Sequence, residues 1–289
     1  MAKFSVIIPF YKGNRFLDNL FRIVKDNRKA LQQAFPESDT ELILVNDSPE
    51  EEIRMPSDAE EIPYRIVAHK ENQGIHQARI TGLAASSGDY ILFLDQDDEI
   101  SDSFLAEQYR TIGNADVVVA GAFYETADGK RTVFYDKPGK IKKITEPSTY
   151  LESHNQIISP GQCLIRKNAI PTEWTQNVMA FNGSDDLFLW ILMFEKHCRF
   201  MVNPDCLYTH KYTGENISAS GTTMAESSLS FASLLRKIPY VPEEHVRLFE
   251  RSRQLDIGLA KSTGLQKIGL VIRNADIIMH RIRWKIKCM

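Results

Sequence analysis

Apolar runs that end in turn or acidic residues recur along the first hundred residues. Four such runs occupy residues 4–9, 41–45, 64–68 and 90–94. Short continuous apolar runs with turn residues at their ends are typical of strands buried on both faces of a parallel sheet. Helical patterns are expected through about residue 34 and from about residue 75 to residue 85. The alternation of strands and helices predicts an α/β fold with a parallel, doubly wound sheet.

The pattern changes after about residue 100. Residues 116–124 and 131–135 flank Asp128-Gly129, which is a hairpin signal, and residues 162–166 suit a further strand. Residues 184–196 suit a helix with Ser184 at its N-cap and two acids in its first turn. After a break near residue 220 the periodicity is helical. We therefore expect one domain over residues 1–220 and a helical C-terminal extension over residues 221–289.

Composition and charge are those of an ordinary globular protein. The 289 residues are 43% hydrophobic and 25% charged, and the net charge of -3 gives no indication of nucleic-acid binding. Four cysteines without paired spacing predict reduced thiols and a cytoplasmic protein. No apolar run reaches the roughly 18 residues that a membrane span requires.

Acidic residues follow two of the predicted strands. Asp95, Asp97 and Asp98 come directly after residues 90–94, and Asp47 follows residues 41–45. An unpaired carboxylate cannot continue a buried strand without a large desolvation cost. The carboxyl ends of parallel strands share one edge, where open α/β sheets bind ligands. Carboxylate oxygens there suit Mg²⁺ or Mn²⁺ shared with a substrate phosphate.

Five ordered blocks share a resemblance. They are SVIIPFYKG, ELILVNDS, Asn72-x-Gly74-x4-Arg79, GDYILFLDQDD and SDDLFLW. Together they resemble the inverting glycosyltransferases of family 2, over roughly residues 3–220. The resemblance implies a GT-A fold, a Rossmann-like and doubly wound mixed sheet. It also implies a nucleotide-diphosphate sugar bound by residues 1–100, an acceptor half over residues 101–220, and Mn²⁺ or Mg²⁺ as cofactor.

The resemblance also implies roles for residues on the donor side. Asp47 is expected to contact the nucleoside, with Pro9 lining the same pocket. Arg79 is expected to contact the nucleotide or its diphosphate. Asp95 is expected on the ribose side and Asp97 at the metal. Such an arrangement stabilises the charge that a nucleoside diphosphate gains as it leaves.

The acceptor side is less defined by the resemblance. Asp185, or else Asp186, is expected to be the catalytic base that deprotonates the acceptor hydroxyl. The choice stays open because Asp185 stands where the family usually has glutamate. His210 is either a third metal ligand with Asp95 and Asp97, a phosphate contact, or a structural histidine.

The absence of one motif bears on the kind of transfer. The Gln-x-x-Arg-Trp motif of processive synthases is missing, because His280 stands in the glutamine place before Arg283-Trp284. We therefore expect single transfers in surface polysaccharide or lipopolysaccharide synthesis. The expected donor is a uridine-diphosphate sugar, and the acceptor a saccharide or lipid-linked saccharide. The alternative is an inactive nucleotide-sugar-binding or scaffold subunit of the same fold, which the acids present in the second, fourth and fifth blocks disfavour.

The end of the chain predicts one basic amphipathic helix over residues 268–287. This helix could pack on the catalytic domain and leave its basic face in solvent. It could instead give peripheral contact, through residues 268–289, with the anionic inner face of the cytoplasmic membrane. The expected apolar face comprises Ile268, Val271, Ala275, Ile278, Ile282 and Ile286, and the expected polar face comprises Arg273, Asp276, His280, Arg283 and Lys287.

Overall fold

The structure is a computed structural model that describes residues 2–152, 154–212, 214 and 221–287. The chain forms two compact units, and each unit is assembled from separate stretches. The sheet unit comprises Met1–Phe134, Ile157–Ile170 and Cys198–Thr213, and the helical unit comprises Tyr135–Gln156, Pro171–His197 and Gly214–Met289. The break expected near residue 220 lies outside the described residues, and the division of the chain at that point stays a prediction.

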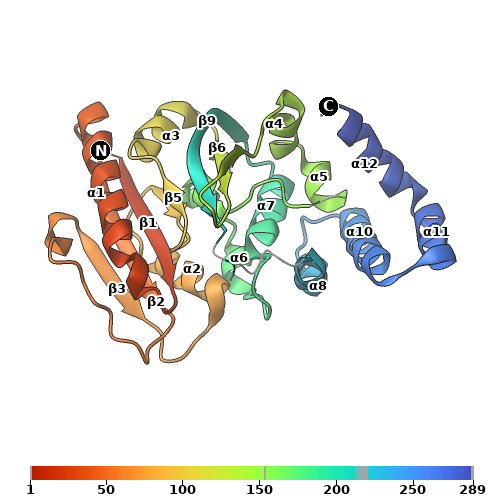
Figure 1. Cartoon of the computed structure of the whole chain (residues 1–289), viewed down its shortest axis with the longest axis horizontal. Helices are drawn as coiled ribbons and strands as arrows, with labels where there is room; N and C mark the ends of the chain where they lie inside the picture. The colour runs from red at the N-terminus through yellow and green to blue at the C-terminus, as the bar shows by residue number, and fades with distance from the viewer. Residues whose placement is uncertain (1, 153, 213, 215–220, 288–289) are drawn as a thin grey trace. The chain divides into compact units, whose positions relative to one another are not determined.

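The first half of the sheet unit is a parallel, doubly wound sheet, as predicted. Its strands lie in the order β3-β2-β1-β4, with β1 paired in parallel to both β2 and β4. The helices α1 and α3 contact each other, and α2 packs on β1 and β2. Right-handed crossovers place α1 and α2 on opposite faces of the sheet. The bounds are β1 (Lys3–Phe10), α1 (Leu17–Ala34), β2 (Asp39–Asn46), β3 (Tyr64–Ala68), α2 (Gly74–Ala85), β4 (Tyr90–Phe93) and α3 (Phe104–Ile112) (Figure 1).

The second half turns the sheet into a mixed one. The strand order continues from β4 through β8, β6 and β9 to β5, while β7 pairs with β6. The predicted hairpin is confirmed by the antiparallel pair β6–β7, and β8 runs antiparallel to both β4 and β6. The bounds are β5 (Glu99–Ile100), β6 (Val117–Glu125), β7 (Arg131–Val133), β8 (Cys163–Arg166) and β9 (Phe200–Lys211).

The long strand β9 has no counterpart in the sequence analysis. It pairs in parallel with β6, and the register shifts on both sides of Gly121. Pro204 and Asp205 lie at this irregularity, between the partners of Ala120 and Gly121. They pass so close to Gly121 that a Cβ atom there would lie 2.6 Å from the Pro204 carbonyl oxygen. Proline within a sheet is confined to edges and bulges. Because Asn203-Pro204-Asp205 resembles a turn sequence, the pattern of residues does not predict a strand here.

The helical unit packs around α7, whose apolar residues are almost all buried. Phe188 of α7 contacts Phe231 at 5.1 Å between ring centroids, and Phe231 stacks at 5.1 Å on Phe249 of α10. No helix among the described residues is long and apolar enough to cross a bilayer. The bounds are α4 (Pro138–Ile144), α5 (Pro147–Glu152), α6 (Thr172–Gln176), α7 (Asp185–Glu195), α8 (Gly221–Ser230), α9 (Ala232–Leu235) and α10 (Glu243–Lys261).

The C-terminal segment differs from the prediction in two ways. It forms two helices, α11 (Gly264–Arg273) and α12 (Ala275–Lys287), because Asn274 leaves the helical conformation with φ -120° and ψ 35° (Figure 1). It also does not follow the first of the two alternatives, in which the helix packs its apolar face on the catalytic domain. Ile277 and Trp284 are the buried residues of α12, whereas most of the expected apolar face is exposed.

Candidate active site

The strand order of the sheet unit reverses beside β1, and we call the carboxyl ends of the strands there the switch-point edge. The chain passes from β1 to β2 on one side, and later returns to β4 on the other side of β1. Open α/β sheets bind ligands at the carboxyl ends of strands beside such a switch point. Asp47 directly follows β2, and Asp95 lies two residues after the end of β4. The two predicted acids therefore lie at the same edge of one sheet.

Asp47 connects this edge to the start of α2. Its Oδ1 accepts hydrogen bonds from the backbone N–H of Gln73 and from His69 Nδ1, both at 2.7 Å, and its Oδ2 accepts from the N–H of Gly74 at 2.8 Å. The φ of Gly74 is 84°, a conformation that favours glycine. His69 Nε2 lies 2.9 Å from Thr81 Oγ1. Asp47 thus caps α2 from a neighbouring strand, a function that the sequence analysis missed.

Arg79 and Asp95 form a largely buried ion pair. Arg79 Nη2 donates to Asp95 Oδ1 at 2.5 Å. The other carboxylate oxygen of Asp95 accepts from Ser159 Oγ at 2.9 Å. Both oxygens of Asp95 therefore have protein donors. Arg79 and Asp95 were each predicted on the donor side, and the structure brings them into direct contact.

Gln96, which stands between Asp95 and Asp97 in the sequence, also contributes to this edge. Gln96 Oε1 accepts from the backbone N–H of Tyr11 at 2.9 Å, and Gln96 Nε2 donates to the Tyr11 carbonyl at 3.0 Å. These two bonds hold the loop after β1, which leaves the Tyr11 ring largely exposed. Pro9 is buried within β1, where it pairs in register with Val45.

Asp97 has the least compensated carboxylate at this edge. It is half-buried, and no side chain among the described residues bonds to it. Burial raises the pKa of Asp97 to about 6, and the charges of Asp98 and Asp95 add to this increase. Three carboxylates so close together concentrate negative charge that a bound cation would neutralise.

Asp98 is fully buried and organises the end of β9. Its Oδ2 accepts from the Tyr208 hydroxyl, its Oδ1 accepts from the N–H of Lys211 at 3.0 Å, and Oδ1 lies 3.1 Å from His210 Nδ1. Burial lowers the pKa of His210, but the hydrogen bond and charge of Asp98 outweigh this effect. The pKa of His210 is therefore raised from its ordinary value. Asp98 anchors the only predicted site histidine.

Asp185 and Asp186 belong to the helical unit, where they begin α7 as predicted. Both are buried. Asp186 Oδ2 accepts from Asn155 Nδ2 at 2.7 Å and its Oδ1 from the N–H of Leu187 at 2.7 Å, while the Asp185 carbonyl accepts from Trp174 Nε1 at 2.8 Å. Ser184 occupies the N-cap, but its side chain does not cap the helix and bonds to Ser228 instead. The predicted N-cap position of Ser184 is therefore confirmed, without a capping hydrogen bond from its side chain.

The structure thus places one set of predicted residues together in the sheet unit. Pro9, Asp47, Arg79, Asp95 and Asp97 lie on or after the strands and helix of the switch-point edge, and His210 joins them through Asp98. Sequence reasoning missed three supporting residues. Gln96 lies within the block GDYILFLDQDD, whereas no sequence motif marks His69 or Ser159. The missed residues are Gln96, His69 and Ser159.

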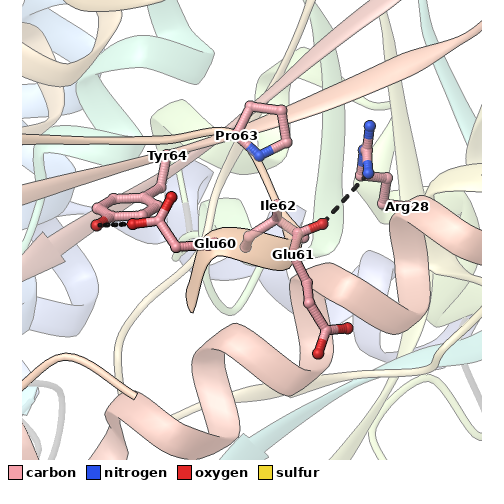
Figure 2. A pocket seen from close by; sticks show the side chains of 6 residues that line it. All are labelled: Arg28, Glu60, Glu61, Ile62, Pro63 and Tyr64. Atoms are coloured by element: carbon pink, nitrogen blue, oxygen red, sulfur yellow. Dashed lines mark hydrogen bonds between the residues drawn. The ribbon is translucent and has the colours of Figure 1, made fainter. Parts of the chain in front are cut away.

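One pocket lies away from this edge. It is lined by Arg28 of α1 and by residues 60–64, which lead into β3, as Figure 2 shows. Arg28 donates to the Glu61 carbonyl at 3.4 Å and to Asp39 at 2.9 Å. Because Tyr64 begins β3, this pocket lies at the amino end of that strand. It is therefore not the switch-point edge.

Comparisons with known proteins agree with the fold and the motifs. The sequence profile of Glycosyl transferase family 2 matches residues 5–172. EpsJ of Bacillus subtilis, an uncharacterized glycosyltransferase, is 32% identical over 148 residues, which are 50% of this chain and 40% of EpsJ. GgaB of the same organism, a minor teichoic acid biosynthesis protein, is 26% identical over 98% of this chain and 29% of its own length. This chain thus spans less than half of either relative.

Solved structures show the same fold at low sequence identity. S. aureus TarS (residues 1–349, in complex with UDP-GlcNAc) superposes with a TM-score of 0.59 and 18% identity, covering 96% of this chain and 80% of that one. The mannosyltransferase PcManGT from Pyrobaculum calidifontis, in complex with GDP-Man and Mn²⁺, gives 0.54 and 12%, covering 99% and 84%. The predicted GT-A fold with C-terminal helices is confirmed. With its profile match over more than half of the sequence, the chain belongs to glycosyltransferase family 2, a family of enzymes.

Proposed function

We propose that this protein is a metal-dependent, inverting and non-processive glycosyltransferase. It would move a sugar from a nucleotide-diphosphate sugar to an acceptor hydroxyl. One observation carries the proposal: the Arg79–Asp95 ion pair and the uncompensated Asp97 lie together at the switch-point edge. A cation, a guanidinium and a carboxylate cluster are what a departing diphosphate requires.

On the donor side, the proposal gives each residue a separate task. Asp47 and Pro9 would border the nucleoside, and Arg79 would meet the nucleotide or its diphosphate. Asp95, held by Arg79 and Ser159, is rigid enough to position a ribose. A uridine-diphosphate sugar is the first candidate, because the similar TarS structure contains UDP-GlcNAc. A guanosine-diphosphate sugar is the alternative donor, because the similar PcManGT structure contains GDP-Man.

The residues at this edge fit a divalent metal. No three His, Cys, Asp or Glu residues converge into a closed metal site within the described part of the chain. Mg²⁺ and Mn²⁺ sites commonly use one or two carboxylates together with substrate phosphates, so Asp97, helped by either Asp95 or His210, would suffice. The bound metal would neutralise charge on the diphosphate. Arg79 contributes positive charge from the protein itself.

On the acceptor side, Asp185 would take the proton from the attacking hydroxyl, with Asp186 as the alternative base. Direct attack by that hydroxyl forms the new glycosidic bond, breaks the bond from the anomeric carbon to phosphate and inverts the anomeric centre. The hydrogen bonds from Asn155 and Leu187 hold the orientation of the Asp186 carboxylate. This support suits either a base or a positioning role for Asp186.

The acceptor would be a saccharide or a lipid-linked saccharide of a surface polysaccharide. GgaB, whose name refers to teichoic acid biosynthesis, supports this class of pathway. A lipid-linked acceptor would bring the enzyme to the cytoplasmic face of a membrane. We therefore include peripheral membrane contact through residues 268–289 in the proposal, of which residues 288–289 lie outside the described part of the chain.

A thermal-shift panel of nucleotides with and without Mn²⁺ tests the proposal. A nucleotide at 100 times its dissociation constant should stabilise the fold by about 2.7 kcal/mol. We expect a response to uridine diphosphate that needs Mn²⁺ and disappears in Asp97→Ala. Without any nucleotide response, the enzyme proposal fails. A response without sugar transfer to any acceptor would favour the inactive binding subunit.

A further inference from the structure

The helices α11 and α12 present aliphatic side chains to solvent, whereas His280 and Arg281 of α12 face their own unit. Leu265 is 85% exposed, Ile272 is 69% exposed and Ile286 is 66% exposed. These values are unusual for large apolar residues, which normally face the core. We call this surface the outward face. It comprises Leu265, Ile268, Ile272, Ala275, Met279, Ile282 and Ile286.

Ionic contacts fix the rotation of α12 about its axis. Both terminal nitrogens of Arg281 bind the Asp256 carboxylate, at 2.6 and 3.1 Å, and its Nε donates to the Glu152 carbonyl at 2.6 Å. His280 Nδ1 lies 2.5 Å from Glu152 Oε2. Asp256 belongs to α10 and Glu152 to α5, so α12 is tied to two other helices. These contacts therefore hold Met279, Ile282 and Ile286 on the side of α12 that faces solvent.

Packing on α10 likewise fixes the rotation of α11 about its axis. Leu270 lies against Gly258 of α10. Leu265, Ile268 and Ile272 are three or four residues apart and share the opposite side of α11. Figure 1 shows α10, α11 and α12 in sequence at the C-terminal end of the chain. Both helices thus leave an apolar strip without a partner in the described chain.

The charges beside this strip are almost entirely positive. Asp276 is the one acid of α11 and α12 among the described residues, and it is bound by Arg251 at 2.9 Å. The exposed cations of the two helices have no acidic partner within the described chain. They are Lys267, Arg273, Arg283, Lys285 and Lys287.

We propose that the outward face of α11 and α12 lies on an anionic lipid surface. Its aliphatic side chains would enter the boundary between headgroups and acyl chains, and the five cations would contact lipid phosphates. This inference rests on the proposed function, because it names the surface at which that enzyme would meet a lipid-linked acceptor. Of the two alternatives that the sequence left open for this segment, it takes the membrane contact and names the face that makes it.

A second copy of the chain is the main competing occupant. The spacing of three and four residues along the outward face also suits a coiled-coil seam. However, the helix breaks at Asn274, so the seam is not continuous. Two copies would also bring their unpaired cations together, which is unfavourable. Charge complementarity therefore favours the lipid surface.

Vesicle sedimentation of the full-length protein tests this proposal. We expect binding to phosphatidylcholine vesicles with about 30 mol% phosphatidylglycerol to be at least about tenfold tighter than to pure phosphatidylcholine. Ile272→Ser with Ile282→Ser should abolish binding, and Arg283→Gln with Lys285→Gln should weaken it about tenfold or more. Matched controls are Ile66→Ser with Val133→Ser and Lys29→Gln with Lys237→Gln, which change exposed residues elsewhere. These controls should bind like the wild type.

Two further measurements distinguish a failure of the lipid proposal from a failure of the proposed enzyme function. Sedimentation equilibrium without lipid should give a monomer. If the wild type is a dimer and the variant Ile272→Ser with Ile282→Ser is a monomer, the outward face binds a second copy of the chain and the lipid proposal is overturned. Equal binding to neutral and anionic vesicles, or no binding, also overturns the proposal. The nucleotide response with Mn²⁺ should persist in all these variants. Its absence from the wild type would overturn the proposed enzyme without affecting the vesicle result.

Discussion

Asp98 and His210 form a buried pair in which the carboxylate Oδ1 lies 3.1 Å from the imidazole Nδ1. A carboxylate on one ring nitrogen fixes the tautomer and leaves the other nitrogen available as a ligand. The sequence analysis did not need Asp98 as a ligand, and the structure gives it a different task. Asp98 positions His210, while the Asp97 carboxylate has no side-chain partner among the residues that the structure describes.

This pair predicts a shared effect on metal affinity. His210→Ala and Asp98→Asn should each weaken Mn²⁺ binding in the presence of uridine diphosphate about 10- to 100-fold, because supporting partners of metal ligands have effects of this size. The double variant should lose little more than either single variant. Calorimetric titration measures the affinities. His245→Ala breaks the His245–Glu195 contact of 2.6 Å and serves as a control. Unchanged affinity in His210→Ala would assign that histidine to structure alone.

Asp97 should destabilise the metal-free fold at neutral pH. Its pKa is raised to about 6, so protonated Asp97 favours the fold below the ordinary pKa of 3.8, and this contribution is lost as the pH rises through about 6. Asp97→Asn should therefore stabilise the metal-free protein by about 1–3 kcal/mol at about pH 7.5 and change little near pH 4. Urea unfolding at both pH values checks this. A variant less stable than the wild type at about pH 7.5 would contradict the prediction.

The two acids of α7 should differ in their effect on transfer. Asp185→Asn should keep nucleotide binding and lower the transfer rate about 10²- to 10⁴-fold, the usual contribution of a general base. Product formation with a saccharide acceptor and calorimetry with uridine diphosphate measure the two properties separately. Retained transfer in Asp185→Asn, with loss in Asp186→Asn, would move the role to Asp186. Asn155→Ala then shows whether the bond to Asp186 contributes to the rate.

Asp47 should contribute to stability as well as to nucleotide binding. Asp47→Ala removes acceptors from two backbone N–H groups and from His69, which should cost about 2–4 kcal/mol through the lost cap and unsatisfied buried donors. Urea unfolding measures the loss, and Asp102→Ala in an exposed position is the control. If Asp47→Ala lost nucleotide affinity with unchanged stability, the cap would be unimportant and direct contact would be the whole role.

The parallel half of the sheet was predictable because its signals are local. Residues 90–94 are continuously apolar and end in acids, so both the strand β4 and the binding edge follow from sequence. The strand β9 was missed because Pro204 interrupts its pattern at an irregular register. His69 and Ser159 were missed because their partners are 22 and 64 residues away in sequence. Such contacts depend on the fold, which no local pattern specifies.

The C-terminal segment shows the limit of periodicity. Amphipathic spacing correctly predicted helices, and it could not show which face packs on the protein. Arg281 is inward because Asp256 and Glu152 are placed to receive it. A hydrophobic pattern assigns apolar residues to the inside by default, and here the ionic contacts of Arg281 together with the burial of Ile277 and Trp284 set the orientation.

The most direct test of the central claim is a calorimetric titration of uridine diphosphate into the wild type and Asp97→Ala, each with Mn²⁺ and with a chelator. We predict saturable binding to the wild type with Mn²⁺ that weakens at least about tenfold in the chelator and in the variant. Equal binding under all four conditions would contradict a metal-held diphosphate at Asp97. Absence of binding by uridine and guanosine diphosphates alike would contradict a nucleotide-sugar donor at this edge.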